Sequence, residues 1–321
     1  MIRVPDISRT GALVILAASV SLSGCGGAGD SAGDSTTPVP GASTATSAGS
    51  TTGFNTPESV LYDEERDVFY VSNINGVPSA VDGNGWIAIV NAASTDSVAH
   101  LVDGGVNGAV LNAPKGLALT GDTLWVADIT AVRSFNRTTG APLTTIALDS
   151  LGATFLNDIA VGPDGALYVT DTGIHIDSTG TITHPGTDRV FRLADGAATI
   201  AIQGDALGRP NGIWWDATNS RFLLAPFGDR ILRAFAPGDS SATEIGIGAG
   251  AFDGVVITPD GRLLVSSWAD SSVSAWNGQS FDRLITNVEA PADIGLDTKR
   301  NVLAIPRFNV GQVDYFTLPA P

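Results

Sequence analysis

LNDIAVGPDGALYVTD, residues 156–171, is the stretch that decides the fold. Two short runs of apolar, β-branched and aromatic residues flank the turn sequence Gly-Pro-Asp-Gly, which is typical of a β-hairpin. The same unit occurs six times after residue 55, and its second strand ends near Asp or Ser. The other copies are TPESVLYDEERDVFYVSN (56–73), APKGLALTGDTLWVAD (113–128), RPNGIWWDATNSRFLLAP (209–226), FDGVVITPDGRLLVSS (252–267) and APADIGLDTKRNVLAIP (290–306).

The spacing of the copies predicts the architecture. Their first strands begin 39 to 57 residues apart, which is typical of one four-stranded propeller blade per copy. No apolar pattern of helical periodicity is found after residue 25. We therefore expect an all-β chain, a six-bladed β-propeller of four-stranded blades over residues 56–321. The sixth copy shows only three strands, and the segment just before Thr56 is expected to supply the fourth and close the ring.

The composition agrees with a folded β domain. Of the 321 residues, 43% are hydrophobic, 16% are charged and 38 are glycine, which excludes a disordered chain and a coiled coil. A formal net charge of −16 repels phosphate, so no nucleic-acid partner is expected. The single cysteine, Cys25, excludes an internal disulfide and a cysteine zinc cluster.

Residues 1–24 are predicted to be a signal peptide. They carry Arg3 and Arg9 near their start and contain the uncharged run 11–22, which is too short to span a bilayer as a helix. Leu-Ser-Gly before Cys25 resembles the lipobox of bacterial lipoproteins, in which the cysteine is acylated. The alternative is an ordinary secretory signal. The resemblance implies a lipid-anchored protein of the bacterial cell envelope, and Gly26 in place of Asp implies the outer membrane, facing the periplasm.

Residues 25–55 consist mainly of Gly, Ser, Thr, Ala and Pro. Such a segment buries too little apolar surface to offset the entropy of ordering, so it is predicted to be a flexible tether. We expect contact with a membrane only through the lipid, a small molecule as substrate or ligand, and a monomeric protein.

The residue that opens the innermost strand of each blade faces the mouth of the central channel. In the six copies these residues are Glu58, Lys115, Asn157, Asn211, Asp253 and Ala292. Four of them carry carboxylate or amide oxygens, which suit a hard cation such as Ca²⁺. Asn and Asp are also common in turns, where their side chains bond nearby backbone groups, so a purely structural role stays open.

These motifs resemble the SMP-30/gluconolactonase family over nearly all of the predicted propeller. The matching residues, in the family's order, are Glu58 in PESVLYD, Asn157 in NDIAVGPDG, Asn211 in PNGIWWD and Asp253 in FDGVVITPDG. The resemblance implies that these four side chains hold one divalent cation, with Ca²⁺ expected. It also implies hydrolysis of small cyclic esters or phosphoesters, in which the cation polarises the carbonyl and lowers the pKa of a bound water.

Within this resemblance, Asp253 is expected to serve as ligand and as proton acceptor. Asp158 and Asp293 stand one position further along their strands. We interpret them as residues behind the ligands that orient Asn157 or a water, the alternative being a bond to turn backbone.

Lys115 departs from the family pattern, in which no charge is expected at the start of the second copy. An ammonium close to a dication would weaken cation binding. Alternatively, Lys115 pairs with Glu58 and replaces the cation, or it turns outward to bind an acidic substrate. Lys115 is therefore a catalytic candidate together with Asp253. The family's Pro two positions after the Glu is also missing, because Val60 stands there.

Two long insertions, 73–85 and 172–188, follow second strands and are expected to form walls of the pocket mouth. His175 and His184 lie in the second insertion. A joint zinc site is disfavoured because no strand or helix spacing brings the two rings together. We interpret both histidines as candidate contacts to a substrate.

The sequence therefore favours a divalent-metal-dependent hydrolase of small lactones or related esters. The alternative is a non-catalytic, lipid-anchored propeller that binds a small molecule, sugar or peptide, because propellers serve many functions. Lys115 beside the oxygen set favours this alternative, whereas the intact set itself favours the enzyme.

Overall fold

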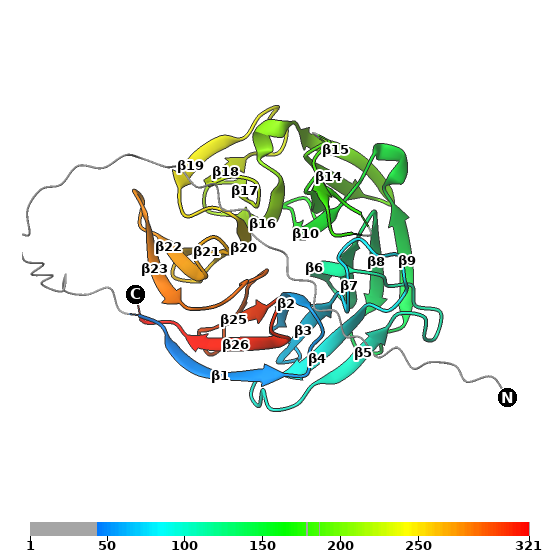
Figure 1. Ribbon diagram of the computed structural model, residues 1–321, viewed down its shortest axis with the longest axis horizontal. Coiled ribbons are helices and arrows are strands. Elements are labelled where there is room, and N and C mark those ends of the chain that lie inside the picture. The colour runs from blue at the N-terminus through cyan, green and yellow to red at the C-terminus, as the bar shows by residue number, and fades with distance from the viewer. Residues whose placement is uncertain (1–43, 178, 186, 321) are drawn as a thin grey trace, which may run out of the picture. The chain divides into compact units, whose positions relative to one another are not determined.

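The computed structural model describes residues 44–177, 179–185 and 187–320. Within these ranges the chain forms six four-stranded antiparallel sheets, arranged as blades around a central axis (Figure 1). The prediction of an all-β, six-bladed propeller is confirmed. The only helices in the described ranges are two 3-10 turns, η1 (Asp149–Leu151) and η2 (Asp205–Leu207), and no helix there is long and apolar enough to cross a membrane.

Each of the first three blades runs in chain order from an inner to an outer strand. Blade 1 contains β2 (Pro57–Asp63), β3 (Val68–Asn73), β4 (Trp86–Asn91) and β5 (Ala99–Asp103). Blade 2 contains β6 (Pro114–Thr120), β7 (Thr123–Asp128), β8 (Ala131–Asn136) and β9 (Pro142–Ala147). Blade 3 contains β10 (Leu156–Val161), β11 (Leu167–Asp171), β14 (Arg189–Ala194) and β15 (Ala197–Gln203).

The last three blades follow the same order, except that the sixth borrows its outer strand. Blade 4 contains β16 (Pro210–Asp216), β17 (Arg221–Pro226), β18 (Ile231–Phe235) and β19 (Thr243–Ile247). Blade 5 contains β20 (Phe252–Ile257), β21 (Leu263–Ser267), β22 (Ser272–Trp276) and β23 (Phe281–Thr286). Blade 6 contains β24 (Gly295–Asp297), β25 (Val302–Arg307), β26 (Gln312–Thr317) and β1 (Thr46–Thr52).

The ring closes where β1 pairs antiparallel with β26, and Figure 1 shows these strands side by side. The expectation that the segment before Thr56 completes the sixth blade is confirmed. The predicted tether, 25–55, is therefore wrong at its C-terminal end, where β1 belongs to the propeller. Composition hides this strand because, apart from Thr51, its side chains are exposed. An edge strand of this kind contributes backbone hydrogen bonds and little apolar burial. The predicted signal peptide and Cys25 lie outside the described residues.

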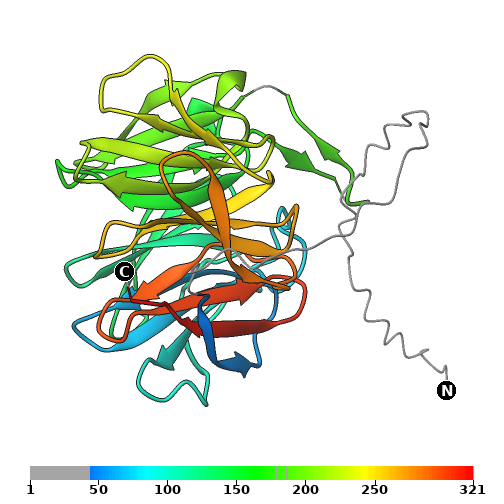
Figure 2. The same cartoon turned by 90° about the vertical axis from the view of Figure 1, so that its left-hand side faces the viewer.

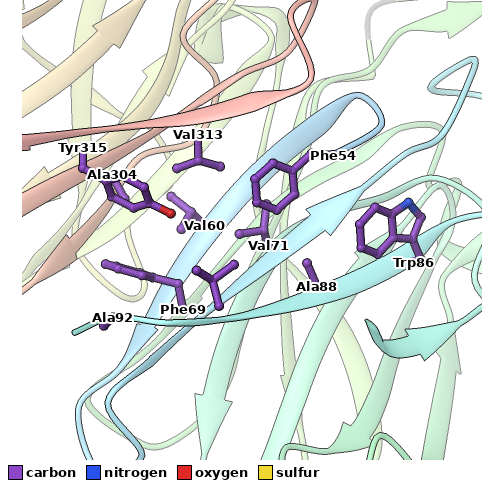
Figure 3. Close-up of a cluster of buried hydrophobic side chains, with 11 residues drawn as sticks. Phe54, Val60, Phe69, Val71, Trp86, Ala88, Ala92, Ala304, Val313 and Tyr315 are labelled. Atoms are coloured by element: carbon purple, nitrogen blue, oxygen red, sulfur yellow. The ribbon is translucent and has the colours of Figure 1, made fainter. Parts of the chain in front are cut away.

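Apolar cores lie between adjacent blades. Figure 3 shows the core between blades 1 and 6, where the ring centroids of Phe69 and Tyr315 are 5.7 Å apart. Trp214 and Trp215 on β16 serve opposite neighbours, since Trp215 packs in the core with blade 3 and Trp214 in the core with blade 5. Full burial of one such side chain contributes about 1.5–3 kcal/mol, so these cores fix each blade against the next.

The inner strands all begin on one face of the wheel, which we call the mouth face. The 172–188 insertion is more ordered than a loop, because it contains a hairpin of β12 (His175–Ile176) and β13 (Ile182–Thr183). In Figure 2 this green hairpin projects from the mouth face. It meets the 73–85 insertion of blade 1, where the Ser79 hydroxyl donates to the Ile176 carbonyl at 2.8 Å.

Candidate functional site

The residues that open the inner strands lie at breaks in strand pairing. The register of each first pair shifts within the first few residues of β2, β6, β10, β16 and β20. Bulges of this kind re-aim a side chain out of the regular alternation of a strand. The shifts span Glu58, Lys115, Asn157, Asn211 and Asp253, which are five of the six opening residues predicted from the repeat.

Glycine beside an opening residue lets the inner strands approach closely. A Cβ at Gly212 would overlap the carbonyl oxygen of Asp253 in the next blade, and a Cβ at Gly116 would overlap Asp158. Because only a residue without a Cβ fits there, Asn211 is held directly against the strand that carries Asp253.

A hydroxyl on the second strand links successive blades. Thr170 Oγ1 on β11 accepts a hydrogen bond from the Asp158 N–H at 2.9 Å and donates to the Asn211 carbonyl at 2.6 Å. Ser266 on β21 makes the corresponding bonds, accepting from the Gly254 N–H and donating to the Ala292 carbonyl. These bonds fix the level of each opening residue relative to its neighbour.

Four buried oxygens at this level have no hydrogen-bond partner in the described part of the chain. They are Glu58 Oε2, Asn157 Oδ1, Asn211 Oδ1 and Asp253 Oδ1. These oxygens come from the four residues that the sequence predicts as cation ligands. Asn157 is oriented for this role, because its Nδ2 donates to Thr172 Oγ1 at 3.3 Å and leaves the oxygen free. A buried oxygen without a donor costs about 1–3 kcal/mol, so four together indicate a ligand site.

The two carboxyl groups of this set share a strained electrostatic environment. Burial raises the pKa of Glu58 well above its ordinary value, and Asp253 raises it further. Burial also raises the pKa of Asp253, with a second contribution from Asp293. Asp253 thus acts on the pKa of Glu58 although the two residues stand in blades 5 and 1. A divalent cation would offset both the burial and the repulsion.

Lys115 is enclosed in the same mouth, with 1% of its surface exposed. Its Nζ donates to the Ala113 carbonyl at 3.0 Å and lies 4.3 Å from the centre of the Phe155 ring. Burial lowers the pKa of Lys115 to about 8, whereas Glu58 acts in the opposite direction. Among the described residues no ion pair joins Lys115 to Glu58, and the side chain does not turn outward. Its placement therefore disagrees with two of the three roles considered from the sequence. These are the ion pair with Glu58 that replaces the cation and the outward contact to an acidic substrate.

Asp158 and Asp293 tie neighbouring blades together. Asp158 accepts hydrogen bonds from the N–H groups of Ile159, at 2.6 Å, and of Ile213 in blade 4, at 2.8 Å. Asp293 accepts one from the Ser59 hydroxyl of blade 1 at 2.5 Å, and burial raises the pKa of Asp293 to about 7. The bonds of Asp158 to two backbone N–H groups correspond to the alternative role considered from the sequence, a bond to backbone. Both residues line a cavity of about 300 Å³ further along the channel.

The two histidines do not form a joint site. His184 Nε2 is hydrogen-bonded to Asp188 Oδ1 at 2.5 Å, and Asp188 also accepts from the Arg209 N–H at 2.6 Å. His175 is exposed on β12. In the described ranges no three His, Cys, Asp or Glu side chains form a metal-binding group. The oxygen set is not such a group because it consists of two carboxylates and two amides.

Trp268 was missed from the sequence. Its Nε1 donates to Asp253 Oδ2 at 2.8 Å. The signal that identifies Trp268 is its position in the repeat, directly after a second strand. Large apolar residues stand at the same position in other copies, namely Ile74, Ile129, Phe227 and Phe308.

Several solved structures share this fold. A luciferin-regenerating enzyme is 13% identical, with a TM-score of 0.63, and the match covers 83% of this chain and 92% of that one. A gluconolactonase from Xanthomonas campestris is 19% identical, with a TM-score of 0.63 and coverage of 84% and 88%. A calcium-binding regucalcin from Agrobacterium tumefaciens is 15% identical, with a TM-score of 0.63 and coverage of 85% and 94%.

At these identities the likeness concerns the fold. No match was found among curated protein sequences. A family model described as the SMP-30/Gluconolactonase/LRE-like region matches residues 56–295, which include all of the opening residues described above. This match extends over most of the chain, and the chain therefore belongs to the SMP-30/gluconolactonase/LRE-like family.

Proposed function

We propose that this protein is a divalent-metal-dependent hydrolase of small lactones or related cyclic esters. The observation that carries the proposal is the set of four buried oxygens without donors, one each from Glu58, Asn157, Asn211 and Asp253. Two carboxylates and two amides form an all-oxygen donor set, which suits Ca²⁺. Membership of the family supports a lactonase-like activity.

These four side chains would hold the cation. When bound, a divalent cation polarises an ester carbonyl and lowers the pKa of the attacking water. Asp253 would also accept the proton that this water loses, and Trp268 orients the carboxylate through its hydrogen bond to Oδ2.

Lys115 supplies positive charge next to the reacting carbonyl. One of its N–H groups is used by the Ala113 carbonyl, and an ammonium has three such donors. The remaining donors stabilise the negative charge that develops on the carbonyl oxygen and then on the carboxylate product.

The test is hydrolysis of a panel of γ- and δ-lactones by the purified protein before and after chelation, with Ca²⁺, Mg²⁺, Mn²⁺ and Zn²⁺ added back singly. Chelation should abolish activity, and Glu58→Gln and Asp253→Asn should each lower kcat/KM at least about 100-fold. Glu244→Gln, an exposed carboxyl on the outer strand β19, is the matched control. Activity that survives chelation or both substitutions would contradict the proposal.

The charge of Lys115 beside the site favours a second candidate function, a non-catalytic propeller that binds a small molecule, sugar or peptide. If the protein binds a cation and a small ligand but turns over no lactone, it is the non-catalytic propeller. We also propose that Cys25 is acylated and anchors the protein in the bacterial cell envelope. Labelling with a radioactive fatty acid should mark the natural chain and leave Cys25→Ala unlabelled.

A further inference from the structure

An apolar collar surrounds the opening of the channel on the mouth face. Each blade contributes one large apolar residue from the turn that follows its second strand. We define the collar as Ile74, Ile129, Ile174, Phe227, Trp268 and Phe308. Because these turns lie on the face where the inner strands begin, the collar stands beside the four unpaired oxygens.

The collar has a covered half and an open half. The isoleucines of blades 1, 2 and 3 are buried, with 1%, 8% and 9% of their surface exposed. Ile74 and Ile129 pack around Ala113, and Ile174 packs against Phe155 and Ile176. The remaining half, on blades 4 to 6, consists of three aromatic side chains that are only partly buried.

The three aromatic rings of the open half form one row. The ring centroids of Phe227 and Trp268 are 5.5 Å apart with the rings nearly perpendicular, at 81°. Trp268 and Phe308 are 5.2 Å apart at 57°. The row reaches the polar centre through the indole N–H of Trp268, which donates to Asp253. An accessible row of aromatic rings is therefore joined, through its middle ring, to Asp253 of the proposed reaction centre.

We propose that Phe227, Trp268 and Phe308 bind a planar, apolar ring of the substrate, so that the preferred substrate is an aryl-fused lactone rather than a sugar lactone. This inference rests on the proposed function. Offset and edge-on contacts between aromatic rings are favourable. A sugar lactone, in contrast, carries hydroxyl groups that need partners, and the only hydrogen-bonding group of the collar side chains, the indole N–H, is already used by Asp253.

The binding test uses two lactams, which keep the six-membered ring but resist hydrolysis. One is 3,4-dihydro-2-quinolone, which carries a fused benzene ring, and the other is δ-valerolactam, which does not. Titration calorimetry on the Ca²⁺-loaded full chain should show about tenfold tighter binding of the fused lactam. Phe227→Leu and Phe308→Leu should each reduce this preference at least about threefold.

Phe281→Leu is the matched control, because Phe281 also lies between two aromatic neighbours, Phe252 and Trp276, but stands on the outer strand β23. It should leave the preference unchanged. Phe227 lies outside the cluster around Ile74, so Phe227→Leu serves as the test even if Phe308→Leu fails to fold. Equal affinity for the two lactams, or a preference that persists in both variants, overturns the inference.

Hydrolysis of dihydrocoumarin and δ-valerolactone, measured alongside, separates this inference from the proposed function. A lactam preference without hydrolysis of either lactone supports the aromatic binding site and overturns the hydrolase. Hydrolysis of both lactones without a lactam preference supports the hydrolase and overturns the aromatic site.

Discussion

Trp268 donates a 2.8 Å hydrogen bond from Nε1 to Oδ2 of Asp253, and the other oxygen of that carboxylate has no partner in the described ranges. One carboxylate thus connects the aromatic row with the proposed cation site. The hydrogen bond fixes the orientation of the carboxylate, and it lowers the pKa of Asp253 against the upward effect of burial and of Asp293.

Trp268→Phe should make cation binding more sensitive to acid. Without the indole N–H the pKa of Asp253 rises further, so protons compete with the cation over a wider pH range. A hydrogen bond to a charged group is worth about 1.5–3 kcal/mol. We therefore expect the Kd for Ca²⁺ to rise about tenfold at pH 6 and by a smaller factor at pH 8. Titration calorimetry at the two pH values measures this.

Trp276→Phe is the control for that substitution, since Trp276 packs at the outer edge of blade 5 against Phe281. It should leave the affinity at both pH values unchanged. If Trp268→Phe weakens binding by the same factor at pH 6 and pH 8, then the indole does not act through the protonation of Asp253.

Lys115→Met should bind the cation more tightly at neutral pH. The ammonium repels a dication, but the protein can also release the lysine proton when the cation binds. Because burial lowers the pKa of Lys115 to about 8, this release costs about 1.4 kcal/mol at pH 7. The affinity gained by Lys115→Met is therefore limited to about tenfold at pH 7.

The same argument predicts how the difference depends on pH. Above pH 8 Lys115 is neutral in the natural chain, so the affinities of natural protein and Lys115→Met should converge by pH 9. Ca²⁺ titrations at pH 7 and pH 9 measure this. Unequal affinities at pH 9 would show that Lys115 influences the site by packing and not by charge.

The repeat allowed much of the architecture to be predicted. Blade number, ring closure and the opening residues all follow from aligning hairpins, because each blade repeats the same local physics of strand, turn and strand. Strand β1 could not be delimited, since all of its residues except Thr51 are exposed and they carry no apolar alternation. Its position depends on the free edge of β26, which is a tertiary property.

The roles of side chains were harder to predict than their positions. The repeat places Lys115 at the channel, but aligning hairpins does not predict that its ammonium ends at the Ala113 carbonyl and the Phe155 ring. Trp268 was missed for a similar reason. A tryptophan between apolar runs has the same local pattern whether it lies in a core or beside a carboxylate.

Gly212→Ala should weaken both the fold and the site. Its Cβ would overlap the carbonyl oxygen of Asp253, so the inner strands of blades 4 and 5 must separate. We expect a loss of about 2–3 kcal/mol in the free energy of unfolding together with weaker Ca²⁺ binding. Urea unfolding and calorimetry measure the two effects.

Gly121→Ala is the control for the backbone change. Gly121 has a φ of +56° and no atom within 4 Å of its Cβ position, so alanine there introduces only backbone strain, about 1 kcal/mol. Its Ca²⁺ affinity should equal that of the natural chain. Normal Ca²⁺ binding by Gly212→Ala would contradict the role given to the close approach of these strands.

The cation-free protein should lose stability as the pH rises toward neutrality, and Asp293 should account for a defined part of the loss. Burial raises the pKa of Asp293 from 3.8 to about 7, so the folded state binds a proton that the unfolded state has released. Its contribution is complete below pH 4 and is lost as the pH rises to about 7. Between pH 5 and pH 7 this amounts to about 2 kcal/mol.

Asp293→Asn can still accept the hydrogen bond from Ser59 but does not titrate. In excess chelator, its free energy of unfolding should therefore fall less between pH 5 and pH 8 than that of the natural chain, by about 3 kcal/mol. Asp164→Asn is the control, because Arg192 lowers the pKa of Asp164 and its contribution changes only at lower pH. Urea unfolding at pH 5 and pH 8 measures these differences. If the free energy of unfolding of Asp293→Asn changes with pH as much as that of the natural chain, then Asp293 is ionised in the folded protein at pH 5.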